Sequence, residues 1–287
     1  MGAPTDETVD LKAWIGRTET AEDVAAAGPL QGLSALLDHE TPPWRAGEAP
    51  PLAHWLYFLP RARQSLITED GHPARGGFLP PTPLPRRMWA GSRLVFHAPI
   101  HIGARLERRS EIADVAAKTG ASGNMLFVTV RHAVYADGQH AVSEDQDIVF
   151  REASTTPTPP PGPAAPHAPC DVARTVTPDA ASLFRFSALT FNAHRIHYDR
   201  DYARDVEGYP GLVVHGPYLA TLLMDHFLRQ RPGAHVKTFA FRARRPVFDL
   251  APFTVCLKDG PREAELWAAG PDGEACMTAT LGLTDGL

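Results

Sequence analysis

Hydrophobic and polar residues alternate along four long segments in the first half of the chain, a pattern typical of strands with one buried face. The segments span residues 92–102, 104–120, 124–137 and 140–152. The alternation is most regular in the third segment, where Leu126, Val128 and Val130 fall on one face. Residues typical of turns separate the segments at 120–123 and 136–139. The pattern therefore predicts an antiparallel sheet.

Each half of the chain also contains a segment with helical character. Residues 20–38 are helix-prone but are interrupted at Gly28-Pro29, and residues 216–230 carry an apolar stripe at helical spacing. Strand-like segments follow the second helix at 236–248, 252–258, 264–269 and 275–283. One long helix with several long antiparallel strands in each half predicts two sheets, each wrapped around a helix. We expect the two sheets to join edge to edge.

A proline-rich segment, residues 153–169, separates these halves. Proline at this density fits neither a sheet ladder nor a helix interior, so the segment is predicted to be an extended linker. It divides the chain into an N-terminal unit, residues 1–152, and a C-terminal unit, residues 170–287. The N-terminal unit is expected to keep the fold without the chemistry and to contribute the acyl pocket.

Composition excludes several classes of function. The chain has 287 residues, 44% of them hydrophobic, and a net charge of -5, so nucleic acid is not an expected partner. No apolar run reaches the ~20 residues that span a bilayer, and the acidic N-terminus has no apolar core of a signal peptide. The three cysteines show no metal-ligand spacing. We expect a cytoplasmic protein, with homo-oligomerisation left open.

Residues 186–199, FSALTFNAHRIHYD, concentrate hydrogen-bonding and proton-transfer groups. Together with GLVVHG at 211–216, this stretch resembles the active-site segment of the MaoC-like, R-specific enoyl-CoA hydratases. The family motif, S/T-G-D-x-N-P-x-H followed by H-G, matches Thr190, Phe191, Asn192, His194, Arg195, His197 and then His215-Gly216. The resemblance implies an α+β double hot-dog fold, in which each sheet wraps a helix.

Three positions depart from the family motif. Asn192 stands at the catalytic Asp, His194 at the Asn and Arg195 at the Pro. The same block, however, looks like that of a subgroup containing mitochondrial-type 3-hydroxyacyl thioester dehydratases and bacterial mesaconyl-CoA and itaconyl-CoA hydratases. The resemblance implies a hydro-lyase that reversibly hydrates an enoyl-CoA. No cofactor is expected, because CoA enters as part of the substrate.

The chemistry of thioester hydration assigns roles to three residues. His197 suits the general base, because an unperturbed imidazole titrates near neutral pH. The backbone N–H of Gly216, at a helix start, suits the enolate oxygen. Asn192 can hold the attacking water but, as an amide, cannot supply a proton to the α-carbon. His197 is therefore expected to take the proton and return it, with Asp199 as a second donor or merely a helix cap.

Other residues are expected to contact the substrate. His194 is predicted to orient the site, and Arg195 to bind an acyl carboxylate or a loop carbonyl. Tyr198 and His215 complete the set around the acyl group. Arg242 and Arg244, on one face of a predicted strand, either clamp the CoA phosphates or form a solvated basic edge.

Two further patterns receive structural interpretations. The His194-x-x-His197 spacing lacks a third ligand, so no metal site is predicted. Asp70-Gly71-His72-Pro73 has the residue types of an acid–base pair, but its Gly and Pro favour a plain turn.

Overall fold

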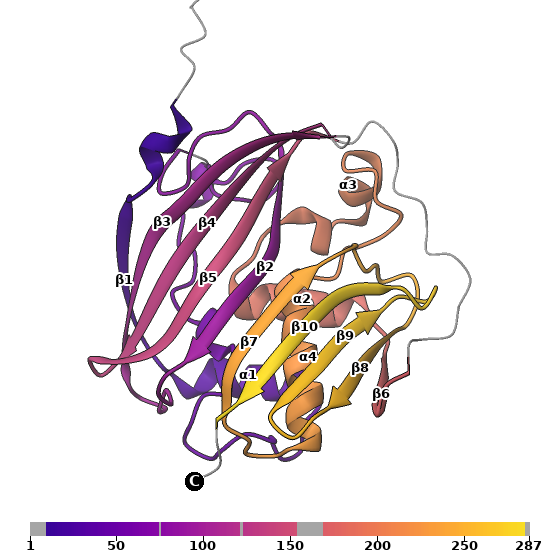
Figure 1. Cartoon of the computed structure of the whole chain (residues 1–287). Coiled ribbons are helices and arrows are strands. Elements are labelled where there is room, and N and C mark those ends of the chain that lie inside the picture. Colours follow the sequence, from indigo (N-terminus) through magenta and orange to yellow (C-terminus); the bar gives the residue numbers. More distant parts are fainter. Residues whose placement is uncertain (1–9, 75, 121–122, 154–168, 285–287) are drawn as a thin grey trace, which may run out of the picture.

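The computed structural model describes residues 10–74, 76–120, 123–153 and 169–284. Its framework is a single curved sheet in the strand order β1-β3-β4-β5-β2-β7-β10-β9-β8-β6, in which neighbouring strands are antiparallel (Figure 1). The strands are β1 Thr18–Val24, β2 Arg86–Phe96, β3 Arg105–Gly120, β4 Gly123–Ala136, β5 Gln139–Arg151, β6 Val172–Val176, β7 Val236–Ala243, β8 Phe253–Asp259, β9 Glu263–Ala269 and β10 Ala275–Leu283.

The two halves meet at the pairing of β2 with β7, which runs from Gly91 opposite Arg242 to Val95 opposite Thr238. Glycine is required at position 91, because an added Cβ would lie 2.4 Å from the carbonyl oxygen of Phe241. Five strands from residues 18–151 thus continue directly into five from residues 172–283. The predicted edge-to-edge antiparallel sheet and the α+β double hot-dog class are confirmed.

Helices lie on the concave side of the sheet and at its ends (Figure 1). They are α1 Ala27–Leu36, α2 Ala180–Thr190, α3 Arg200–Asp205 and α4 Gly216–Gln230, with short 3-10 helices at Leu11–Trp14, Ala53–Leu56, Gln64–Leu66 and Arg195–His197. Helix α4 contacts β8, β9 and β10, and its residues 218–228 are all buried. The predicted apolar stripe is therefore part of a helix enclosed on every side.

The N-terminal half differs from the prediction of one long central helix. Residues 18–24 form the edge strand β1, paired with β3, and only Ala27–Leu36 are helical. Pairing with the long strand β3 outweighs the helix propensity of this short segment. The predicted break at Gly28-Pro29 is absent, because these residues lie in the first turn of α1, where proline is tolerated. The sheet of this half instead curves over a cavity.

Other local predictions also need correction. The first strand, predicted at 92–102, is β2 and begins at Arg86. Strand β7 ends at Ala243, before Arg245-Pro246, so Arg244 lies outside the strand and the predicted shared face with Arg242 does not exist. Strand β6 and helix α2 were not predicted. Most of the proline-rich segment, residues 154–168, lies outside the described residues.

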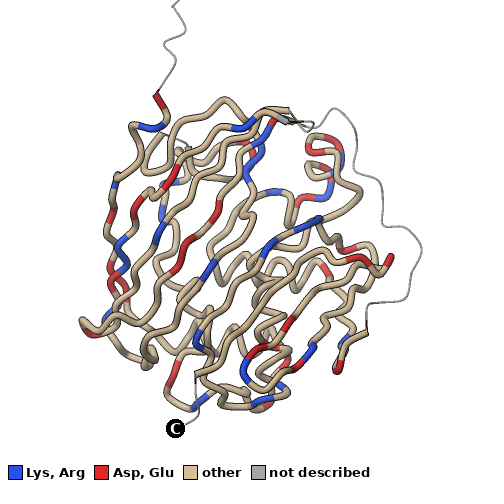
Figure 2. The backbone as a smooth tube through the Cα atoms, viewed as in Figure 1, with Lys and Arg blue, Asp and Glu red and all other residues tan. Residues whose placement is uncertain are grey.

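Positively and negatively charged positions mix along β3, β4 and β5 (Figure 2). Across the described part of the chain, no helix is both long and apolar enough to cross a membrane.

Candidate active site

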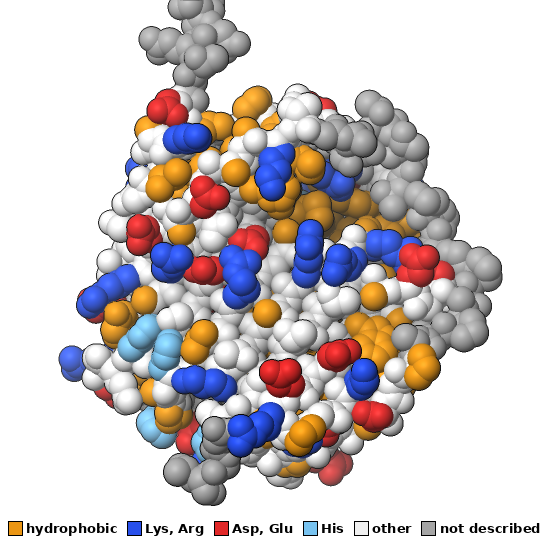
Figure 3. Space-filling view, in the orientation of Figure 1, with side chains coloured by type: hydrophobic (Ala, Val, Ile, Leu, Met, Phe, Trp, Pro, Cys, Tyr) orange, Lys and Arg blue, Asp and Glu red, His pale blue; other side chains and the backbone are white. Residues whose placement is uncertain are grey.

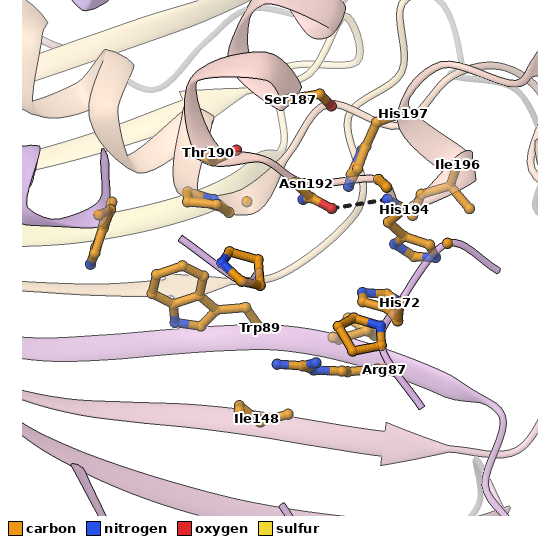
Figure 4. A pocket seen from close by; sticks show the side chains of 18 of the residues that line it. His72, Arg87, Trp89, Ile148, Ser187, Thr190, Asn192, His194, Ile196 and His197 are labelled. Carbon is orange, nitrogen blue, oxygen red and sulfur yellow. Dashed lines mark hydrogen bonds between the residues drawn. The ribbon is translucent and has the colours of Figure 1, made fainter. Parts of the chain in front are cut away.

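A cavity of about 990 Å³ lies between the two halves and is lined by both. Its opening is visible as an apolar hollow bordered by basic side chains (Figure 3). Asn192, His194 and His197 line it from the C-terminal half, and His72, Arg87 and Trp89 line it from the N-terminal half (Figure 4). The double sheet therefore places the predicted motif against residues from more than a hundred positions earlier.

The end of helix α2 directs the motif into this cavity. Asp179 and Ser182 form a capping box at its start, and Phe191 ends it with φ 48°. This left-handed conformation favours glycine, which is the residue that the family motif has at this position. Asn192 follows, and its Oδ1 accepts a 3.0 Å hydrogen bond from the backbone N–H of His194. The amide NH₂ of Asn192 remains to hold a water or substrate oxygen.

His197 has the tautomer that a general base requires. Its Nδ1–H donates to the carbonyl oxygen of Val213 at 2.7 Å, so Nε2 carries the lone pair. The side chain is buried, and burial lowers the pKa of His197 to about 3, with a further contribution from His194. His197 is thus neutral across physiological pH with Nε2 as its acceptor atom, and burial leaves it a weaker base than the unperturbed imidazole assumed from the sequence.

The ring of His215 stacks on the ring of His197. The two rings stack with centroids 3.6 Å apart, and His215 Nε2 shares a 2.8 Å hydrogen bond with Ser187 Oγ. Burial holds the pKa of His215 well below its usual value, so the stacked pair carries no charge at neutral pH. His215 is not among the described residues that line the cavity, and its predicted contact with substrate stays a prediction.

Helix α4 begins at Gly216, which lines the cavity. Amides of a first helical turn have no acceptor within the helix, and the helix dipole adds partial positive charge there. An added Cβ at Gly216 would come no closer than 3.7 Å to other atoms, so packing alone does not require glycine. A glycine here keeps the space in front of the amide open for a thioester oxygen.

The turn predicted at Asp70–Pro73 is present. It packs against the catalytic loop, which is the segment 192–199 that carries Asn192, His194 and His197. The backbone N–H of Arg195 donates to the carbonyl oxygen of Asp70 at 2.9 Å, and the His72 and His194 rings lie 4.1 Å apart. Gly71 has φ +91°, and a Cβ there would lie 1.8 Å from the carbonyl oxygen of Ala193. The N-terminal half therefore lines part of the cavity, where the sequence analysis expected its acyl pocket, and its expected lack of catalytic groups stays a prediction.

Because of this packing, Gly71→Ala should lower the free energy of unfolding by more than left-handed backbone strain alone explains. Gly103 has φ +92° and nothing within 4 Å of an added Cβ, so Gly103→Ala is the matched control. Left-handed strain costs about 1–2 kcal/mol in both variants, and overpacking against Ala193 adds about 1–3 kcal/mol in Gly71→Ala only. Urea unfolding measures the difference. Equal losses in the two variants would show that the turn does not pack tightly on the loop.

Several predicted residues point away from the cavity. Arg195 Nε and Nη2 donate to Asp199 Oδ2 at 3.0 and 2.7 Å, its Nη1 donates to the Glu69 carbonyl, and its guanidinium stacks on Tyr202. Asp199 also accepts from the N–H of Tyr202 as the N-cap of α3, so it is a helix cap. Arg195 is absent from the described cavity lining.

The remaining predicted residues divide between the cavity and the outer surface. Tyr198 is 48% exposed and lines the cavity. Arg244 lines it as well, beside Arg245, which pairs with Asp272. Arg242 is exposed and is not part of the described lining, which fits the alternative of a solvated basic strand.

A polar cluster beneath the N-terminal sheet was missed by the sequence analysis. Glu144 is buried and accepts hydrogen bonds from His54 Nε2–H at 3.0 Å and from Ser92 Oγ–H at 2.6 Å. Burial opposes its ionisation, but the hydrogen bond from His54 prevails and holds the pKa of Glu144 at about 2. Burial lowers the pKa of His132, opposite Glu144 across β4 and β5, to about 4.

Glu144, His54 and His132 line the same cavity, and so does Arg108. Burial lowers the pKa of Arg108, and its Nε has no hydrogen-bond partner among the described residues. One signal for the cluster was present in the sequence, since His132 continues the face of Leu126, Val128 and Val130 at a spacing of two. A polar residue on a predicted core face indicates a pocket or a buried network.

Comparison with known proteins places this site in a family. The profile of the family described as hydroxyacyl-thioester dehydratase type 2 matches residues 52–249, which include both sides of the cavity. The chain belongs to this family. It is also 48% identical over 284 residues to the mesaconyl-C(4)-CoA hydratase of Chloroflexus aurantiacus, covering 96% of this chain and 99% of the relative. The predicted MaoC-like relationship and the hydro-lyase class are confirmed.

Solved structures agree with the fold. HtdX of Mycobacterium tuberculosis superposes with a TM-score of 0.67 at 18% identity, covering 93% of this chain and all of that one. A second protein of the same organism, described as having a double hot-dog fold, superposes with a TM-score of 0.54 at 14% identity, covering 94% and 96% of the two chains. At such low identity these structures bear on the fold alone.

Proposed function

We propose that the protein reversibly hydrates a short enoyl-CoA thioester, with a branched dicarboxylic acyl group such as mesaconyl-CoA or itaconyl-CoA favoured. The observation that carries the proposal is the placement of a neutral His197 and the N-terminus of α4 in one cavity. The 48% identity to a mesaconyl-C(4)-CoA hydratase supports the substrate class.

The proposed mechanism assigns charge development to fixed groups. Asn192 holds the water, and His197 Nε2 takes its proton as the oxygen attacks the β-carbon. Negative charge then builds on the thioester oxygen, where the Gly216 amide and the dipole of α4 stabilise it. Arg244, at the cavity lining, contributes positive charge for the CoA phosphates. The α-carbon still needs a proton, which an amide at position 192 does not supply.

A 3-hydroxyacyl-thioester dehydratase of fatty-acid synthesis is the second candidate, and the family description favours it. The buried carboxylate of Glu144 and the half-buried guanidinium of Arg108 in the same cavity argue against a long alkyl chain, because apolar carbons gain nothing from contact with desolvated charges. A catalytically inactive acyl-CoA-binding protein is the third candidate, since Asn192 replaces the catalytic acid.

Turnover of three thioesters separates these candidates. Wild-type protein is mixed with mesaconyl-CoA, crotonyl-CoA and a long-chain enoyl-CoA, and the loss of enoyl-thioester absorbance is followed. We expect the highest kcat/KM for the dicarboxylic ester. A preference for the long chain would favour the dehydratase of fatty-acid synthesis, and measurable affinity without turnover would identify a binding protein.

A dicarboxylic acyl group needs a cation near its free carboxylate, because an unpaired buried carboxylate is very costly. The sequence-based prediction gave this role to Arg195, whose guanidinium is engaged by Asp199. Arg87 is better placed, because it lines the cavity across from His197, on the same strand as Trp89 (Figure 4). Burial is the largest cause of the lowered pKa of His194, followed by His72, and the charge of Arg87 lowers this pKa further.

Arg87→Met should therefore lower kcat/KM selectively for mesaconyl-CoA, by about 2–5 kcal/mol in transition-state stabilisation. Crotonyl-CoA has no second carboxylate and should be affected far less. Arg195→Met is the matched control and should alter both substrates by the same factor. A selective loss in Arg195→Met, with none in Arg87→Met, would return the carboxylate-binding role to Arg195.

A further inference from the structure

We propose that the Asp70–His72 pair, from the N-terminal half, is the second proton-transfer group of this site. In this role His72 protonates the α-carbon while His197 takes the proton from water. The inference rests on the proposed hydratase function and adds to it a catalytic residue outside the MaoC-like motif. It also supplies the acid that Asn192 is chemically unable to replace.

The first observation is that Asp70 is built to hold His72. The Asp70 carboxylate accepts hydrogen bonds from Thr68 Oγ1–H at 2.5 Å, from the backbone N–H of His72 at 2.9 Å and from His72 Nδ1–H at 3.0 Å. Burial opposes ionisation of Asp70, but the hydrogen bonds from His72 and Thr68 prevail and hold its pKa well below the usual value. A fixed carboxylate on Nδ1 orients the ring and stabilises an imidazolium, as in an acid–base dyad.

The second observation is the position of His72 beside the predicted base. His72 lines the same cavity as His197, and the His194 ring lies between them, with centroids 4.1 Å from His72 and 5.4 Å from His197 (Figure 4). One side-chain nitrogen or oxygen atom each from Asp70, His72 and His194 lies within 4.8 Å of the others. Nδ1 of His72 hydrogen-bonds to Asp70, and in this proposal the proton is transferred at the other ring nitrogen, Nε2.

The third observation is that the turn cannot move independently of the catalytic loop. The Asp70 carbonyl oxygen accepts the N–H of Arg195, and Gly71 packs against Ala193 more closely than any residue with a Cβ allows. A surface turn with no role in the site has no need of such contacts. The docking fixes the distance between a dyad from one half and a base from the other, which is what proton transfer requires.

The proton and electron balance closes without a cofactor. A water O–H bond breaks, its proton goes to His197 Nε2, and the oxygen bonds to the β-carbon. The C=C π electrons move toward the thioester, and the α-carbon then takes the proton from His72 Nε2, whose N–H electron pair stays on the ring. The proton on His197 returns to His72 through cavity water or the intervening His194. In dehydration each step reverses.

Among the described residues, the charged and titratable groups near the pair include His194 and His197 on the loop after α2, Arg87 on β2, and Tyr202 and Glu207 in and just after α3. Burial lowers the pKa of His194 to about 3, so this ring is neutral when it contacts His72. Asp70, whose carboxylate accepts from His72 Nδ1–H, balances a positive charge on His72.

The experiment compares His72→Gln, Asp70→Asn and Glu69→Gln in steady-state hydration of mesaconyl-CoA across pH 6–9. Glu69→Gln removes a negative charge one residue from Asp70 and is the matched control. We expect His72→Gln to lower kcat by about 100-fold or more, the usual worth of a general acid, with little change in KM. Asp70→Asn should lower kcat about tenfold and move the alkaline decline of kcat to lower pH, because the imidazolium loses its counter-charge.

Other results would overturn the proposal. A His72→Gln variant with kcat within threefold of wild type, or a rate loss with an unchanged pH profile, would reduce the pair to a structural turn. Loss of wild-type activity in EDTA with recovery in Zn²⁺ would instead assign these side chains to a metal. If the wild type hydrates no enoyl-CoA, the proposed function itself fails, and that outcome is distinct from an insensitive His72.

Discussion

Replacing His197 with Asn should lower kcat for enoyl-CoA hydration by about 100-fold to 10,000-fold, the usual contribution of a general base. The Asn amide can still donate to the Val213 carbonyl, which now accepts from His197 Nδ1–H at 2.7 Å. Its side chain, however, has no basic nitrogen to accept a proton from water. The loss should appear in kcat rather than KM, because the proton moves only in the transition state.

A matched control is available in His226, which is also buried and whose Nε2–H donates to the Val172 carbonyl at 3.2 Å. His226 lies on α4 outside the described cavity lining. His226→Gln keeps a donor near the position of Nε2 and should retain turnover within a few-fold. Near wild-type kcat in a folded His197→Asn variant, or equal losses in both variants, would contradict the role of His197 as the base.

Acidification from pH 7 to pH 5.5 should cost the protein about 3–4 kcal/mol of its free energy of unfolding through His132, His194 and His197, and the buried His215 adds to this cost. Burial lowers the pKa of His132 to about 4, and those of His194 and His197 to about 3. In the unfolded chain a histidine titrates near 6.5. Below this pH the unfolded state therefore binds protons that the folded state does not bind. Stability therefore falls as pH drops from about 6.5 toward 3–4 and is retained above 6.5.

Urea unfolding at pH 7.0, 6.0 and 5.5 measures this dependence. His132→Gln and His197→Asn should each flatten the slope of unfolding free energy against pH by about one proton. Exchange of the exposed His101 for Asn is the control for loss of a surface imidazole. The pKa of Glu144 is about 2, so this group changes the free energy of unfolding only below about pH 4.5. It does not affect the measurements between pH 7.0 and 5.5. A flat profile between pH 7.0 and 5.5 would contradict the burial of the three neutral rings.

The sequence was sufficient for the sheet and for the C-terminal motif because both depend on local patterns. Alternation predicted β3, β4 and β5 closely, and the order FNAHRIH fixed Asn192, His194 and His197 on one loop. Residues 20–24 were assigned to a helix, since their pairing with β3 is a tertiary contact that no local pattern contains.

The site itself was predicted only on its C-terminal side. Asp70-Gly71-His72-Pro73 is a turn, as predicted, but its place beside His194 depends on how two distant halves dock. Of the two roles left open for Arg195, the contact with a loop carbonyl is present, since its Nη1 donates to the Glu69 carbonyl while Asp199 accepts from Nε and Nη2. Sequence spacing fixes which residues share a loop, whereas contacts across the β2–β7 junction decide which residues share a cavity.

Hydration of mesaconyl-CoA by the purified wild-type protein tests the central claim most directly. The measurement is the loss of enoyl-thioester absorbance together with mass-spectrometric detection of an acyl-CoA heavier by one water, with crotonyl-CoA run in parallel. The account predicts catalytic formation of the hydrated product from mesaconyl-CoA at a higher kcat/KM than from crotonyl-CoA. Absence of a hydrated product from either thioester, in a folded protein that binds both, would contradict it.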